Sequence, residues 1–213
     1  MTPKPTTADL IRQLAASPAP QPFRTAKVAA GVLAGVGVML VVFWSTFGLR
    51  ADLASAWQLV AVQAKSLLPL LLAGVAIWLA LGSSRPEARL ALWPLAVPLG
   101  LGLALVVQRL VLATGPIPMD EAVNPSAIVC LSAVTLLSAL PLGVGVAMLR
   151  RAAPVRPGVT GALLGLAVGA GVAAGYALYC TEDSPLFFML WYSLAIGIVA
   201  GCGAILGLRF LRW

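Results

Sequence analysis

Two cysteines carry most of the unusual chemistry in this sequence. Cys130 and Cys180 each lie near one end of a long apolar run, and Cys180 is followed by the acids Glu182 and Asp183. A thiol in such a place can be oxidised, can bridge to a partner, or can bind a soft metal ion. The residues alone leave three interpretations open: a sensing pair, two unrelated small residues, or a permanent disulfide. Cys202, between two glycines, is expected to be a small packing residue.

Lys65 is the second candidate, because it lies several residues inside an apolar run. A charge at that depth either extends to the membrane interface or pairs with an acid, such as Glu182 or Glu121. Glu182 is therefore a candidate to tune the thiol of Cys180 or to pair with Lys65. Arg109 has the same alternatives, an interfacial position or an ion pair.

Several kinds of chemistry are excluded. The sequence has no histidine, so neither a histidine metal site nor histidine acid–base catalysis is available. No Cys-x-x-Cys motif and no nucleophile–base pair is visible, so we do not expect an enzyme. The sequence calls for no cofactor, and a bound metal ion would use Cys130 and Cys180. Three cysteines are too few for a disulfide scaffold.

The elements that position these residues are membrane helices. Of the 213 residues, 61% are hydrophobic and only 10% are charged, which is typical of a membrane protein. Each of six apolar runs approaches the ~20 residues needed to cross a bilayer, where only helices satisfy their own backbone. We therefore predict an all-α membrane protein, a bundle of six transmembrane helices at about 26–47, 58–81, 91–112, 125–149, 158–180 and 186–208.

The charges predict the orientation of this bundle. Five of the seven acids fall in the connectors of one side, whereas most basic residues fall on the other, which predicts that the basic side and both termini are cytoplasmic. The net charge of +7 lies in these connectors, so direct nucleic-acid binding is not expected. The basic side carries Lys4, Arg12, Arg24, Lys27, Arg85, Arg89, Arg150, Arg151, Arg156, Arg209 and Arg212.

The N-terminal segment, residues 1–25, is distinct from the membrane domain, residues 26–213. Residues 7–16 predict one short cytoplasmic helix, capped by Thr7 or Asp9, and three prolines between 18 and 22 end it. Its apolar side chains share one face. They are Leu10, Ile11 and Leu14.

Glycines recur every four residues in several apolar runs, a spacing that lets membrane helices approach closely. Contacts between helices of one chain and a dimer face both remain open. The helix centres carry almost no polar residue, which disfavours the alternative function, a small transporter or channel for a solute or ion. The glycines are Gly31, Gly35, Gly161, Gly165, Gly169, Gly171, Gly175, Gly203 and Gly207.

The chain also resembles a known family. From Pro125 to Trp213 it is similar to the NrsF-type family of six-helix bacterial membrane proteins, negative regulators of extracytoplasmic-function sigma factors. The first three long helices match loosely, although Lys65 stands where similar proteins carry a lysine. The motifs are Asp9-Leu10-Ile11-Arg12, Leu14-Ala15-Ala16, Cys130 with Val134, Leu136-Leu137-Ser138 and Pro141, Met148-Leu149-Arg150, Ala153-Pro154-Val155-Arg156, Tyr176-Ala177-Leu178-Tyr179-Cys180-Thr181-Glu182, Trp191-Tyr192, Gly203-Ala204-Ile205-Leu206-Gly207 and Leu211-Arg212-Trp213.

The resemblance implies a membrane-bound anti-sigma factor of the bacterial inner membrane. It would hold an extracytoplasmic-function sigma factor and release it when outer-face Cys130 and Cys180 respond to stress, such as a heavy metal or an oxidant. Residues 1–25 would bind the sigma factor, and the inner loops would add positive charge. The expected contact residues are Asp9, Leu10, Ile11, Arg12 and Leu14.

Two places depart from the family pattern. Leu131 follows Cys130, where the family usually has proline. Tyr179 and Thr181 flank Cys180, where the family usually has His-Cys-Pro-Glu. The missing imidazole removes a ligand or base beside the thiol, so any mechanism here must work with two thiols.

Overall fold

Six long helices form the protein. The computed structural model describes residues 6–16, 24–84, 91–113, 119–152 and 154–212, and within these ranges it contains helices and no strand. All six are long and apolar enough to cross a membrane, which confirms the predicted fold class. They are α2 (Thr25–Phe47), α4 (Val60–Ser83), α5 (Ala96–Val111, preceded by a 3-10 turn, Trp93–Leu95), α7 (Ser126–Leu149), α8 (Pro157–Tyr176) and α9 (Pro185–Phe210).

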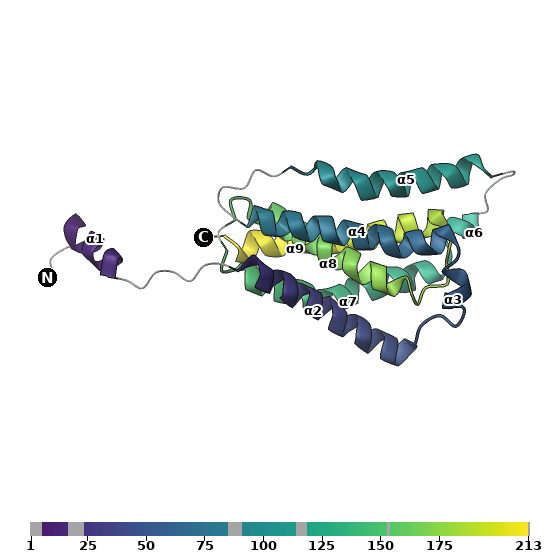
Figure 1. The fold of residues 1–213 in the computed structure, drawn as a ribbon, viewed down its shortest axis with the longest axis horizontal. Coiled ribbons are helices and arrows are strands. Elements are labelled where there is room, and N and C mark those ends of the chain that lie inside the picture. Colours follow the sequence, from purple (N-terminus) through teal and green to yellow (C-terminus); the bar gives the residue numbers. More distant parts are fainter. Residues whose placement is uncertain (1–5, 17–23, 85–90, 114–118, 153, 213) are drawn as a thin grey trace.

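The bundle has two different ends. Because the chain crosses it six times, α2 begins and α9 finishes at the same end, which we call the terminal end (Figure 1). The opposite end, which we call the cysteine end, holds the α8–α9 connector. Two short helices that the sequence did not predict, α3 (Leu53–Ala56) and α6 (Met119–Ala122), also lie there.

Helix α8 is the centre of the bundle. In its most apolar stretch 72% of the residues are buried, against 11% in the span that contains α5. It packs mainly on α9 and α4, while α2 packs mainly on α7. Glycine and alanine dominate its sequence, so neighbouring helices can approach its backbone closely.

The glycine faces are used within the chain. A Cβ at Gly161 would overlap the carbonyl of Gly203, and a Cβ at Gly165 would overlap the carbonyl of Val199. The other glycines singled out in the sequence also have atoms of this chain within 4 Å of where a Cβ would stand. Contact between helices of one chain is therefore the observed use of this spacing.

Helix α1 (Thr7–Ala16) forms where the sequence predicted it and stands clear of the bundle in Figure 1. Its cap differs from the expected one. Thr6, rather than Thr7 or Asp9, precedes the first turn: its backbone N–H and its hydroxyl donate to Asp9 Oδ2 at 3.3 and 2.5 Å, and the backbone N–H of Asp9 donates back to that hydroxyl at 3.3 Å. This reciprocal pattern is a capping box, with Asp9 at its third helical position.

One helix end was predicted wrongly. The fifth apolar run continues to residue 180, but α8 ends at Tyr176, so Cys180 lies in the connector and not on the helix. The backbone N–H of Arg50 donates to the carbonyl of Leu178 at 3.2 Å, and the Arg50 side chain donates to the carbonyl of Cys180 at 3.3 Å. External donors thus satisfy carbonyls of the connector, in place of the N–H groups that a continuing helix would supply. The other predicted ends agree within two residues when the 3-10 turn Trp93–Leu95 is counted as the start of the third span.

Candidate functional site

The structure brings Cys130 and Cys180 together. Cys130 lies in the second turn of α7, and Cys180 lies in the α8–α9 connector. Both are free thiols, only 1% and 6% exposed, and they belong to the same buried cluster. Their side chains are close enough to share a hydrogen bond. Fifty residues apart in sequence, the thiols are direct neighbours at the cysteine end.

Two tyrosines that the sequence analysis named only as parts of family motifs surround this thiol pair. The Tyr176 hydroxyl lies beside Cys130, and the Tyr192 hydroxyl lies beside Cys180. Their rings also contact each other, with centroids 6.2 Å apart. Tyr176 precedes Cys180 by four residues, which is the one local signal that could have drawn attention to it. The pair is therefore enclosed by aromatic side chains and shielded from solvent.

Lys65 does not extend to the interface, because it is completely buried. Its ammonium donates to the carbonyl of Cys180 and to Asp183 Oδ1, both at 2.5 Å, and to the carbonyl of Glu182 at 3.3 Å. Of the two expected uses, pairing is thus the observed one, but its acid is Asp183. Such pairing is what allows a charge to be buried.

Arg50 completes the charged part of the site. It donates two hydrogen bonds of 2.8 Å to Asp52 and two more, of 2.8 and 3.1 Å, to Asp183. Asp183 is therefore shared by the guanidinium of Arg50 and the ammonium of Lys65. We call Arg50, Asp52, Lys65 and Asp183 the Asp183 cluster. It ties the α2–α3 connector and α4 to the segment that carries Cys180.

The cluster changes the acidity of its surroundings. Burial raises the pKa of Asp183, but hydrogen bonds from Arg50 and Lys65 outweigh burial and leave it below its ordinary value. A hydrogen bond with Cys130, together with the positive charge of Lys65, lowers the pKa of the Cys180 thiol despite burial. A lowered pKa favours the thiolate, which is the form that attacks oxidants and binds metals. The surroundings of Cys180, with Lys65 beside it, thus favour its thiolate form.

Glu182 has a different partner from the expected ones. Its Oε1 accepts a hydrogen bond of 3.3 Å from the Ser126 hydroxyl at the start of α7, and only its backbone carbonyl contacts Lys65. It therefore fastens the connector to α7. Arg109 pairs with Glu121 at 2.9 and 2.7 Å, and the pair, with Ser184 donating to Glu121, secures α6.

The residues expected to bind a partner lie on α1. Leu10 and Ile11 are 48% and 62% exposed, and Arg12 forms a loose ion pair of 3.7 Å with Asp9. The side chain of Leu14 lies outside the described part of the structure, as do Arg85 and Arg89. In the described ranges no three His, Cys, Asp or Glu residues converge as a metal site. A metal at the thiol pair would have two sulfur ligands from this chain.

Comparison with known proteins assigns the family. Residues 13–213 match the sequence profile of the NrsF family, described as negative regulator of sigma F. The chain belongs to this family. Its matched region contains the whole bundle, both cysteines and the Asp183 cluster. NrsF membership agrees with the resemblance found in the sequence motifs.

Two curated relatives share a segment with this chain. The anti-sigma-F factor NrsF of Caulobacter vibrioides is 38% identical over 84 residues, which is 39% of this chain and 39% of that protein. The probable anti-sigma-F factor NrsF of Azospira oryzae is 40% identical over 81 residues, 37% of this chain and 38% of that protein. The chain thus aligns with about two fifths of each relative's length. No solved structure matches it.

Proposed function

We propose that this protein is an anti-sigma factor of the bacterial inner membrane. It sequesters an extracytoplasmic-function sigma factor and releases it under stress. The observation that carries this proposal is the NrsF match over residues 13–213. The printed names of both relatives support it. Six membrane-spanning helices agree with a regulator that keeps its partner at a membrane.

The N-terminal segment, residues 1–25, is the proposed docking region. Its helix α1 exposes Leu10 and Ile11 on one face, although both are large and apolar. Laying such a face into a groove of a partner is a common mode of recognition. A segment of this length can cover about 800 Å², the usual share of one partner in a stable interface. An exposed apolar helix face of this kind fits a protein partner.

The proposed orientation places docking in the cytoplasm. Exposed basic residues gather at the terminal end of the bundle, where the N-terminal segment enters α2, and this distribution is typical of cytoplasmic connectors. The cysteine end would then face the outer compartment. The described basic residues of the terminal end are Arg24, Lys27, Arg150, Arg151, Arg156, Arg209 and Arg212.

The thiol pair is the proposed sensor. With a two-electron oxidant such as a peroxide, Cys130 and Cys180 would lose two electrons and two protons and form one disulfide, while the oxidant is reduced. With a soft divalent metal ion, two S–H groups would release their protons and two metal–sulfur bonds would form. The closeness of the two thiols and the lowered pKa of Cys180 support both reactions.

Helix α7 is proposed to transmit a change at the thiol pair to the terminal end of the bundle. A bond between the thiols would change how α7 sits against the α8–α9 connector. Helices α7 and α8 are joined at the terminal end by residues 150–156, whose Arg150, Arg151 and Arg156 are exposed. A movement of α7 would therefore reach the end at which the sigma factor is proposed to dock.

Affinity purification of the intact protein in detergent tests sigma binding. We expect a sigma factor to co-purify with the full chain, as identified by mass spectrometry. Deletion of residues 2–20 should abolish capture while the protein still inserts. Capture that survives the deletion would move the docking site to the connectors of the terminal end.

Serine variants test the sensor separately from docking. Cys130→Ser and Cys180→Ser should still capture the sigma factor but should not release it when metal or oxidant is added. Cys202→Ser is the matched control, because Cys202 is exposed on α9 and distant in sequence from the pair. If the Cys130→Ser and Cys180→Ser proteins release the sigma factor as the wild type does, the sensing assignment is wrong.

A further inference from the structure

A long apolar groove runs along the bundle between α2 and α4. It encloses about 640 Å³, a volume typical of small-molecule sites. Leu33 and Leu40 of α2 form one wall, and Leu70 and Ile77 of α4 form the other. Its floor is α8. Nothing in the proposed anti-sigma activity uses this groove.

The groove exists because the chain places small residues around it. Helix α2 packs mainly on α7 and α4 packs mainly on α8, and in Figure 1 α2 diverges from α4 toward the cysteine end. The floor contributes Gly171 and Ala174. Gly37 and Gly74 also line the groove, and a Cβ at either would meet no atom within 4 Å. The bundle therefore leaves this space unfilled by its own side chains.

Two polar side chains mark the groove at the cysteine end. Ser66 lines it and is only 6% exposed, yet its hydroxyl has no hydrogen-bond partner in the described part of the chain. A helical serine usually donates to a carbonyl of the preceding turn, and a buried hydroxyl without a partner is uncommon. Trp57 also lines this end, and tryptophan favours the headgroup level of a membrane. An occupant with a hydrogen-bond acceptor beside Ser66 would satisfy the hydroxyl.

The length of the groove fits the acyl chain of a lipid. Along α4 the lining runs from Ser66 to Ile77, about 16 Å at 1.5 Å per residue. One leaflet of a hydrocarbon core is about 15 Å deep, half of about 30 Å. Water does not fill an apolar space of this kind. We propose that the groove binds one phospholipid, with an acyl chain between α2 and α4 and an ester oxygen accepting from the Ser66 hydroxyl.

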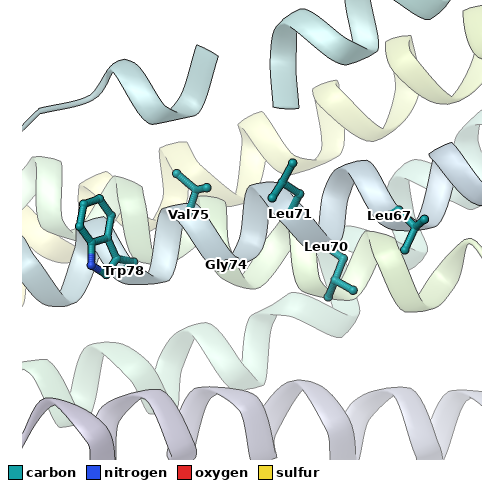
Figure 2. Close-up of a pocket in the computed structure, with 6 residues that line it drawn as sticks. All are labelled: Leu67, Leu70, Leu71, Gly74, Val75 and Trp78. Carbon is teal, nitrogen blue, oxygen red and sulfur yellow. The ribbon is translucent and has the colours of Figure 1, made fainter. Parts of the chain in front are cut away.

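The adjoining face of α4 accommodates the second chain of the same lipid. It forms a shallow hollow of about 530 Å³ that shares Leu67, Leu70 and Gly74 with the groove. Figure 2 shows Leu70 pointing toward α2, while Leu71 and Val75 point to the opposite side of the helix. A lipid with two chains can therefore lie over Gly74, with one chain on each side of Leu70.

Lipid titration followed by native mass spectrometry tests the site. Detergent-purified, delipidated protein is titrated with palmitoyl-oleoyl phosphatidylglycerol. We expect one molecule to bind well before any others. Combining Gly37→Leu with Gly74→Leu fills the groove and should weaken this first binding at least tenfold. Ser66→Ala keeps the space but removes the donor, so it should weaken binding about threefold, in the range of one ordinary hydrogen bond.

Matched controls come from glycines outside the groove. A Cβ at Gly143 of α7 or at Gly197 of α9 also meets nothing within 4 Å, and neither residue lines the groove. Gly143→Leu and Gly197→Leu should bind the lipid as the wild type does. Equal loss in these controls, or unchanged binding in the filled protein, overturns the proposal. The proposal is also overturned if the wild type and the controls form a dimer that the filled variant does not form. A second copy of this chain would then be the occupant of the groove.

Photocrosslinking of the wild-type chain does not depend on how the variants fold. The probe is a phosphatidylcholine that carries a diazirine in one acyl chain, used at low content in phosphatidylcholine vesicles. Crosslinks should concentrate on groove residues such as Leu33, Leu70 and Ile77. Crosslinks spread evenly over the lipid-facing sides of α5, α7 and α9 would show ordinary bilayer contact and overturn the site.

Discussion

At the scale of single residues, Lys65 is the cation of the Asp183 cluster that lies within a membrane-spanning helix. It is fully buried and donates to Asp183 and to the carbonyl of Cys180. Lys65→Met keeps most of the stem but removes the ammonium, so Asp183 loses a cation and the carbonyl loses a donor. Removing one partner of a buried ion pair costs about 3–5 kcal/mol. We expect a loss toward the lower figure, because Asp183 is partly exposed, measured as free energy of unfolding in detergent.

Lys65→Arg is the control for charge at this position. It keeps a cation that can reach Asp183, although a larger group must fit into a full site. It should therefore recover part of the stability that Lys65→Met loses. If Lys65→Met unfolds at the same denaturant concentration as the wild type, the Asp183 cluster contributes nothing measurable to stability.

Asp183 predicts a pH dependence of stability. Its pKa is lower in the folded protein, since hydrogen bonds from Arg50 and Lys65 outweigh burial. The resulting stability is complete above the pKa of an unfolded aspartate, about 3.9, and is lost as the pH falls through the lower folded value. Asp183→Asn cannot titrate. The gap in melting temperature between wild type and Asp183→Asn should be large near neutral pH and shrink in acid; a constant gap would contradict the prediction.

Residue pairings were the least predictable part of the site. The sequence indicated that Lys65 needs an acid, because a charge inside an apolar run must be compensated. It did not identify Asp183, because the choice among neighbouring acids depends on how the connector folds back over α4. Arg50, which the sequence analysis did not single out, binds the same carboxylate. The closeness of the two cysteines was a hypothesis from their shared depth, and the described structure places them together.

At the scale of elements, the contact between α8 and α9 depends on glycine. Gly165→Ala would push a methyl group into the backbone of α9, at the carbonyl of Val199 and the Cα of Ala200. Overpacking of this kind costs about 1–3 kcal/mol. Gly197→Ala, where an added Cβ meets nothing within 4 Å, should be neutral or slightly stabilising, since alanine favours helix. Unfolding of both variants by denaturant would test the difference, and equal stability would contradict it.

The helices themselves were largely predictable, because the length of an apolar run is set by the thickness of the membrane. The exception at Tyr176 shows the limit of that argument. Residues 177–180 are as apolar as a helix end, but Arg50 binds the carbonyls of Leu178 and Cys180 from outside. A pattern of apolar residues cannot reveal a hydrogen-bond donor that comes from a distant part of the chain. The short helices α3 and α6 were also missed. Each is only four residues long, which is too short to show a helical pattern in the sequence.

At the scale of the whole molecule, the two ends of the bundle divide the chemistry. Among the described residues, the thiol pair and the Asp183 cluster lie at the cysteine end, and the exposed basic connectors lie at the terminal end. An even number of crossings places the start of α2 and the finish of α9 at the same end. The separation of acidic from basic connectors was readable in the sequence. The central place of α8 was less evident, because the pattern of a run shows that it is apolar but not which neighbours surround it.

The apolar face of α1 is where the proposed output can be tested without disturbing the bundle. Leu10→Asp with Ile11→Asp places two charges on the face proposed to enter a groove of the sigma factor. Two desolvated charges without partners would oppose that contact, so sigma capture in an affinity purification should fall at least tenfold, about 1.4 kcal/mol. Membrane insertion should not change, because α1 stands clear of the bundle. Ala16→Asp is the control, since Ala16 is exposed about half a turn away from this face. Equal capture by all three proteins would mean that α1 is not the docking helix, whereas loss with Ala16→Asp as well would show an effect of negative charge rather than of the apolar face.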